Sequence, residues 1–168
     1  AAEGMGERLM NPRLSQPQAL RLPSDIVEIR DVSPGSSYGE FWRALSGQGG
    51  LFADRGAEMM RWRLADPDLP RRPLLLGRVE SGRLTGAAMA MTAKTSLIDP
   101  PSLEILDLQA LEGSDAVPLL TRALIRNARG TGAAKVRLQA LTPELLTRLG
   151  ALGGSARREG GWGHGHAV

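Results

Sequence analysis

The chain has 168 residues, of which 42% are hydrophobic and 23% charged, as expected for one globular domain. It has no cysteine, which excludes disulfides and thiolate chemistry and fits a reducing compartment, so we expect a cytoplasmic protein. No apolar run reaches the ~18 residues of a membrane span. The net charge is only +3 and 4% of the residues are aromatic, which argues against a nucleic-acid groove with its basic stripe and stacking rings.

The amino-terminal segment 1–24 is predicted to be a linker or an extended lead-in, because prolines interrupt a polar sequence without periodicity. We place a single domain over residues 25–168. Its first element is a strand over 25–32, where apolar and polar residues alternate. Helical spacing then predicts helices over 38–45 and 54–64.

A β-hairpin is predicted next, because segments 73–80 and 84–95 flank a short glycine-bearing turn. In its second strand, alanines at 88 and 90 alternate with methionines at 89 and 91. Small residues on one face would let a helix approach closely, and methionines on the other face fit ordinary core packing. Trp62, in the preceding helix, is expected to anchor the core or its rim.

The stretch 103–132 is the centre of the predicted fold. A mostly apolar strand over 103–110 leads through a polar turn into an amphipathic helix, which Ser114 or Asp115 can cap. Glycines at 130 and 132 end that helix. The junction of a strand with a helix amino terminus often binds anionic cofactors, because backbone amides and the helix dipole point at the ligand.

The last part of the chain predicts another strand over 134–141 and a helix that begins at Thr142-Pro143-Glu144. A final strand is expected within 156–168. A run of strands followed by strand–helix–strand units indicates an α/β fold, with a mixed sheet and helices on both faces.

This order of elements, together with four local patterns, resembles the GNAT superfamily of acyl-CoA-dependent N-acyltransferases from Val27 to Gly154. The patterns are VEIRDVSPGSSYGEFWRAL, RWRLADPDLP, LLLGRVESGRLTGAAMA and VRLQALTPELLTRLGALG. The chain looks most like the degenerate half of tandem GNAT proteins of bacteria. The resemblance implies a mixed, mostly antiparallel sheet flanked by helices, and acetyl-CoA or another acyl-CoA as cofactor. It also implies a small-molecule or carrier-bound amine as acceptor, and a second GNAT-like domain or a homodimer as possible partner.

The resemblance also implies where the cofactor would bind. In active members the central strand parts from its neighbour, its backbone pairs with the pantetheine arm, and the following turn wraps the diphosphate. The matching positions in this sequence are Leu108, Gln109, Ala110, Gly113, Ser114, Ala116 and Thr142.

Two features of the sequence depart from the family pattern. The turn Leu111–Ala116 has one glycine, no arginine and two acids, and each carboxylate would repel a diphosphate by about 1 kcal/mol. The tyrosine that protonates the departing thiolate in active members corresponds to Leu149, which cannot donate a proton. The one tyrosine of the chain, Tyr38, is expected on a remote early helix.

Asp107 and Glu104, on the central strand, are the candidate general bases. Asp107 comes first because it interrupts an otherwise apolar strand, although an ion pair with an arginine explains such a residue more often. His164 and His166 would share one face of a strand, but local spacing indicates no third ligand, so no metal site is expected.

Two functions follow from these observations. The first is acyl transfer from acetyl-CoA or acyl-CoA to an amine. The second is a non-catalytic GNAT-like domain that supports a partner domain or binds a ligand. Binding of acetyl-CoA distinguishes them.

Overall fold

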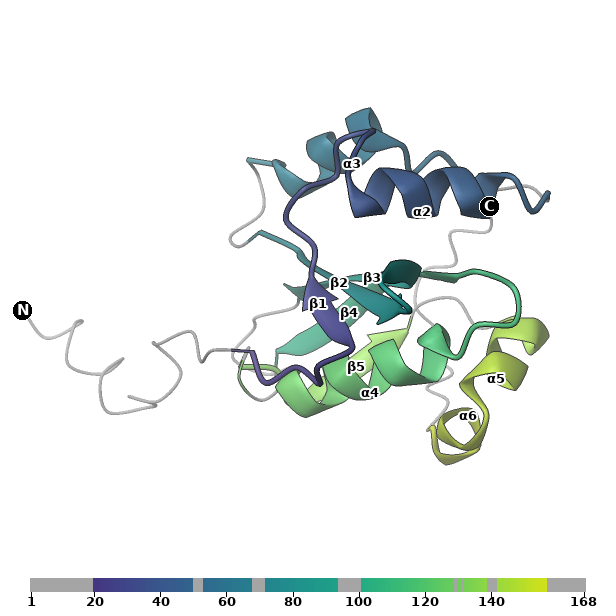
Figure 1. The fold of residues 1–168 in the computed structure, drawn as a ribbon. Helices are drawn as coiled ribbons and strands as arrows, with labels where there is room; N and C mark the ends of the chain where they lie inside the picture. Colours follow the sequence, from purple (N-terminus) through teal and green to yellow (C-terminus); the bar gives the residue numbers. More distant parts are fainter. Residues whose placement is uncertain are drawn as a thin grey trace, which may run out of the picture.

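A five-stranded sheet forms the centre of the molecule in the computed structural model, which describes residues 20–49, 53–67, 72–93, 101–128, 130, 132–138 and 142–156 (Figure 1). The strands lie in the order of the sequence and are β1 (Ile26–Glu28), β2 (Leu74–Glu80), β3 (Arg83–Ala93), β4 (Ser102–Ala110) and β5 (Lys135–Leu138). The strands from β1 to β4 pair antiparallel, and β5 pairs parallel to β4. This confirms the predicted mixed, mostly antiparallel sheet.

Helices cover both faces of the sheet, as predicted. In Figure 1, α2 (Ser37–Ser46) and α3 (Ala57–Leu64) lie above it and α4 (Ala116–Ala128) lies below. The short helices α5 (Pro143–Leu149) and α6 (Ala151–Ser155) follow β5 and lie beside α4. In the described ranges, no helix is long and apolar enough to cross a membrane.

Each face of the sheet has its own hydrophobic core. Ala88 and Ala90 pack in the core that includes α4, and Met89 packs in the core that includes α2 and α3. The prediction that the alanine face of the hairpin receives a helix is therefore confirmed. The buried side chains of the α4 core include Leu76, Leu103, Ile105, Leu120 and Leu124, and those of the α2–α3 core include Tyr38, Phe41, Leu45, Met60 and Leu75.

Helix and sheet approach each other closely at Gly86 of β3 and Ala116, the first residue of α4. A Cβ atom added to Gly86 would lie 2.3 Å from the Cβ of Ala116 and 3.0 Å from the backbone oxygen of Gln109. Since real Cβ contacts are never that short, the start of α4 depends on a glycine at this position.

Several predicted boundaries differ from the structure. β1 is shorter than predicted, although Ile29 beyond it still donates a backbone hydrogen bond to Leu75. α3 begins three residues after Asp54, because the Asp54 carboxylate accepts the N–H of Gly56 and forms a turn before the helix. The prediction for Trp62 was wrong, since its side chain is 69% exposed. The final strand predicted within 156–168 falls almost wholly outside the described residues.

The described end of the lead-in is attached to α4. The buried side chain of Asn127 accepts the backbone N–H of Arg21 at 2.7 Å and donates to the carbonyl of the same residue at 3.1 Å. Leu20 and Leu22 pack against the α4 core. Residues 20–22 thus contribute to the domain.

The contact between Gly86 and Ala116 predicts that Gly86→Ala destabilises the fold by about 1–3 kcal/mol, the usual cost of overpacking a core. Chemical denaturation followed by circular dichroism measures the change. Gly35→Ala is the matched control, because a Cβ added there meets no atom within 4 Å. Equal stability of the two variants would contradict the close approach.

Candidate functional site

Among the described residues, the pairs of β4 with β3 extend further along the strand than its pairs with β5. Its hydrogen-bonded register with β3 extends from Ser102 to Ala110, whereas its register with β5 ends at Ile105, opposite Leu138. The carboxyl-terminal half of β4 therefore continues past the last described pair with β5. Backbone N–H and C=O groups on such an edge can pair with an extended ligand.

A β-bulge in β4 determines which side chains face which core. Ala90 pairs with Ile105 and Met89 pairs with Asp107, so Leu106 is an extra residue without a partner on β3. Beyond the bulge, Asp107 and Gln109 lie on the α2–α3 face of the sheet. Leu108 and Ala110 pack in the α4 core, so a ligand between β4 and β5 would contact them through their backbone.

The carboxylate of Asp107 is bound by two arginines from the segment that carries α3. Arg55 Nε donates a hydrogen bond to Asp107 Oδ2, and Arg63 Nη1 lies 3.5 Å from the same oxygen. The three side chains are between 15% and 25% exposed. The expected structural alternative, an ion pair with arginine, is therefore present. Both guanidinium groups use Oδ2, and no described residue hydrogen-bonds to Oδ1.

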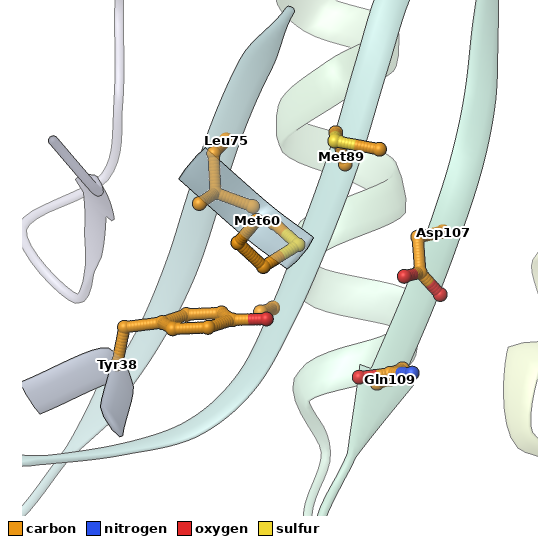
Figure 2. A pocket seen from close by; sticks show the side chains of 7 residues that line it. Tyr38, Met60, Leu75, Met89, Asp107 and Gln109 are labelled. Atoms are coloured by element: carbon orange, nitrogen blue, oxygen red, sulfur yellow. The ribbon is translucent and has the colours of Figure 1, made fainter. Parts of the chain in front are cut away.

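Tyr38 lies across a small cavity from Asp107 and Gln109, with its hydroxyl pointing towards β4 (Figure 2). The cavity volume is about 10 Å³, close to that of one water molecule. The expectation that Tyr38 is remote from the site was wrong, because α2 packs over the sheet. Its hydroxyl donates to the carbonyl of Arg55 at 3.1 Å. Burial, and secondarily the charge of Asp107, raises the pKa of Tyr38 far above its ordinary value of about 10.

Glu104 lies in the half of β4 that is paired with β5. It is buried, accepts the hydroxyl of Ser102 at 2.7 Å and lies 3.8 Å from Arg137 Nη1 on β5. Because of the bulge, Glu104 and Asp107 lie on the same face of the sheet, opposite Met91 and Met89 of β3. Their described partners differ, however, and the contacts of Glu104 with Ser102 and Arg137 stabilise the β4–β5 pair.

The turn between β4 and α4 already uses several of its own backbone donors. The N–H groups of Ser114 and Ala116 bind Leu111 O and Ser114 Oγ, and that of Glu112 binds the side-chain oxygen of Gln48. Gly113 has a φ of 74°, and a Cβ built there would meet no atom within 4 Å, so the turn is open at this residue. One of its two acids, Asp115, pairs with Arg78 at 3.3 Å.

Helix α5 faces the same end of β4. Thr142 is its N-cap, as predicted, and the Thr142 hydroxyl accepts the N–H of Leu145 at 3.1 Å. Leu149 is buried in the α4 core. Arg148 Nη2 donates to the carbonyl oxygens of Ala110 and Leu111, at 3.3 and 3.1 Å. Sequence reasoning missed Arg148, because local spacing does not indicate that its side chain reaches another element.

In the part of the chain that the structure covers, no three His, Cys, Asp or Glu side chains come together as metal ligands. His164 and His166 lie outside that part.

The ion pairs of Asp107 with Arg55 and Arg63 predict a large coupling energy. In a double-mutant cycle of Asp107→Asn and Arg55→Gln, we expect a coupling energy of about 1–3 kcal/mol. Asp107→Asn removes the carboxylate that both arginines share, and Arg55→Gln leaves Asp107 with only the longer contact to Arg63. Urea denaturation measures all four proteins. The control cycle uses Glu28 and Arg30, which are paired at 2.8 Å in the open solvent and should couple less. Equal couplings would show that the Asp107 contact is no stronger than a surface pair.

Tyr38 can be titrated by itself, since it is the only tyrosine of the chain. We expect no phenolate absorbance at 295 nm between pH 10 and 11 in the folded protein, and a midpoint near pH 10 in denaturant. Because the folded pKa is the higher one, the phenol stabilises the fold fully below pH 10, and this contribution is lost progressively at higher pH. A native midpoint near 10, with circular dichroism unchanged, would disprove this burial effect.

The sequence matches no protein-family model, and no curated protein is similar to it in sequence. Solved structures are similar in fold. A ribosomal-protein-alanine N-acetyltransferase from Brucella melitensis biovar Abortus superposes with a TM-score of 0.57 at 14% identity, over 80% of this chain and 93% of that one. For a glucosamine-6-phosphate N-acetyltransferase from Arabidopsis thaliana the TM-score is 0.55 at 16% identity, over 80% and 92%.

An aminoglycoside acetyltransferase from an uncultured soil metagenomic sample, solved in complex with sisomicin, gives a TM-score of 0.56 at 12% identity, over 80% of this chain and 90% of that one. In all three cases the similarity in fold extends over 80% of this chain. The chain therefore has the GNAT acetyltransferase fold that its sequence patterns resemble.

Proposed function

We propose that this protein is an N-acyltransferase that transfers an acyl group from acetyl-CoA or another acyl-CoA to an amine. The observation that carries the proposal is the carboxyl-terminal half of β4, which continues past Ile105, its last described pair with β5, and leads through the turn at Gly113 into α4. In a fold shared with N-acetyltransferases, this arrangement offers an extended backbone edge beside a turn that has room for a phosphate group.

The residues present fit the cofactor in outline. The backbone of Leu108, Gln109 and Ala110 would pair with the amides of a pantetheine arm, and the turn from Gly113 to Ala116 would face the diphosphate. When bound, the cofactor supplies an acyl group activated as a thioester. Ser114 and Thr142 hold this frame in shape, because their hydroxyls cap α4 and α5.

We assign the role of general base to Asp107. Both arginines bind Oδ2, so Oδ1 can accept a hydrogen bond from a water in the cavity next to Tyr38. That water would carry the proton from an acceptor amine to the carboxylate. Glu104 takes no part in this step, because it lies in the paired half of the strand.

The acceptor that we propose is a small-molecule or carrier-bound amine. The similar structures are named for an aminoglycoside, an amino-sugar phosphate and an alanine of a ribosomal protein, so the fold accommodates amines of different size. A bulky acceptor would need α2 and α3 to shift, because the cavity beside Asp107 has room for about one water.

A second candidate function is a non-catalytic domain that binds a ligand or supports a second GNAT-like domain or a copy of itself. Two observations favour it. Leu149 cannot protonate a leaving thiolate, and the Asp107 carboxylate holds Arg55 and Arg63 as a structural ion pair would. Under this proposal Asp107 stabilises the fold and has no proton to accept.

Titration with acetyl-CoA by calorimetry tests the proposed function. We expect a dissociation constant below 1 mM, and acetyl-CoA at 100 times that constant should stabilise the fold by about 2.7 kcal/mol. Asp107→Asn should bind acetyl-CoA equally well and lower kcat for amine acetylation by about 10²-fold or more. Glu28→Gln is the control, because it makes the same kind of change at an exposed carboxylate of β1. Absence of acetyl-CoA binding would favour the second candidate function.

A further inference from the structure

Arg148 differs from the other partly buried arginines with described contacts. Arg55, Arg63 and Arg78 each pair with an aspartate. Arg148 is half-buried as well, but its described bonds go to two backbone carbonyls, those of Ala110 and Leu111. Among the described residues, no carboxylate pairs with it.

Hydrogen bonds to two carbonyls hold the guanidinium of Arg148 in place and use only some of its N–H donors. Both are made by Nη2, and a guanidinium has five N–H donors in a fixed plane. Three donors, on Nε and Nη1, have no acceptor in the described part of the chain. Because the two carbonyls already fix the side chain, little side-chain entropy would be lost when an anion binds.

The position of this guanidinium is the end of β4, where the turn to α4 begins. Figure 1 shows α5 beside that turn. Leu111, whose carbonyl Arg148 binds, directly precedes the two residues Glu112 and Gly113. The turn itself contains no basic residue and two acids, so the described positive charges next to it come from other elements: Arg78 of β2 pairs with Asp115, and Arg148 of α5 binds the carbonyl of Leu111.

We propose that Arg148 binds the diphosphate group of the acyl-CoA and thereby replaces the arginine that the turn lacks. The inference rests on the proposed function. The remaining N–H donors of Arg148 would form charge-assisted hydrogen bonds with the diphosphate oxygens, opposite the open backbone at Gly113. The carboxylates of Glu112 and Asp115 would repel the diphosphate and so lower its affinity. The ion pair between Asp115 and Arg78 reduces that repulsion.

The test compares two ligands that share the pantetheine arm. CoA also carries the diphosphate and the 3′-phosphoadenosine, whereas S-acetylpantetheine carries neither, so inorganic diphosphate is measured as a third ligand that isolates the diphosphate. Calorimetry measures all three with the wild type, Arg148→Ala, Arg148→Lys and the control Arg122→Ala, which removes the same charge from an exposed position on α4. We expect Arg148→Ala to weaken CoA at least tenfold and to leave S-acetylpantetheine unchanged. Arg148→Lys should recover part of the loss, because it keeps the charge without the planar fork.

Three results would overturn the inference. The first is equal CoA affinity in Arg148→Ala and Arg122→Ala, and the second is an equal loss for CoA and S-acetylpantetheine, which would mean a structural role. The third is tighter CoA binding by Arg148→Ala, which would make Arg148 an obstruction. Melting temperatures without ligand show whether each variant is folded.

Inorganic diphosphate separates this inference from the proposed function. If the wild type binds inorganic diphosphate through Arg148 but not CoA, the anion site stands and the acyltransferase proposal fails. If the wild type binds CoA and Arg148→Ala does not change that affinity, the acyltransferase proposal stands and the anion site at Arg148 fails. Binding of neither ligand overturns both.

Discussion

The pairing of β4 is the constraint on which the rest of the structure depends. Along one edge β4 is bonded to β3 throughout its length, and along the other its last described pair with β5 is at Ile105. Because β3 fixes one edge along its whole length, β4 stays extended beyond Ile105 as well. Backbone N–H and C=O groups of its other edge therefore continue to the place where the turn to α4 begins.

The charged groups around β4 contribute to stability and to the candidate site at once. Asp107 joins the segment of α3 to the sheet through Arg55 and Arg63, and Arg148 joins α5 to the end of β4. Each of these contacts lies at the edge of a region that a substrate or cofactor would occupy. Such contacts cost affinity if a ligand has to break them, and they provide preorganised partners if it does not. Among the described residues, Asp107 Oδ1 and the Nε and Nη1 groups of Arg148 have no partner, which favours the second case.

Local sequence signals predicted the elements and the order of the fold. The N-cap Thr142 and the alternating alanines of β3 are examples, since caps and periodicity depend on neighbours in sequence. The site was harder to predict because it depends on distant contacts. The arginines that bind Asp107 lie 44 and 52 residues away, and Tyr38 reaches β4 only because α2 packs over the sheet. The prediction that Trp62 anchors the core or its rim was wrong for a related reason, because a large apolar residue is buried only if another element covers it.

The bulge at Leu106 changes which side chains of β4 face which core. Before it, successive side chains of β4 alternate between the two cores, and after it the alternation resumes in the opposite phase. Loss of this single residue would place Asp107 directly after Ile105 and restore an unbroken ladder, because their partners Ala90 and Met89 are already consecutive on β3. The residues from Asp107 onward would keep their β3 partners and their faces of the sheet. Deletion of the codon for Leu106 would therefore remove one apolar side chain from the α2–α3 core and leave Asp107 on the same face as its two arginines.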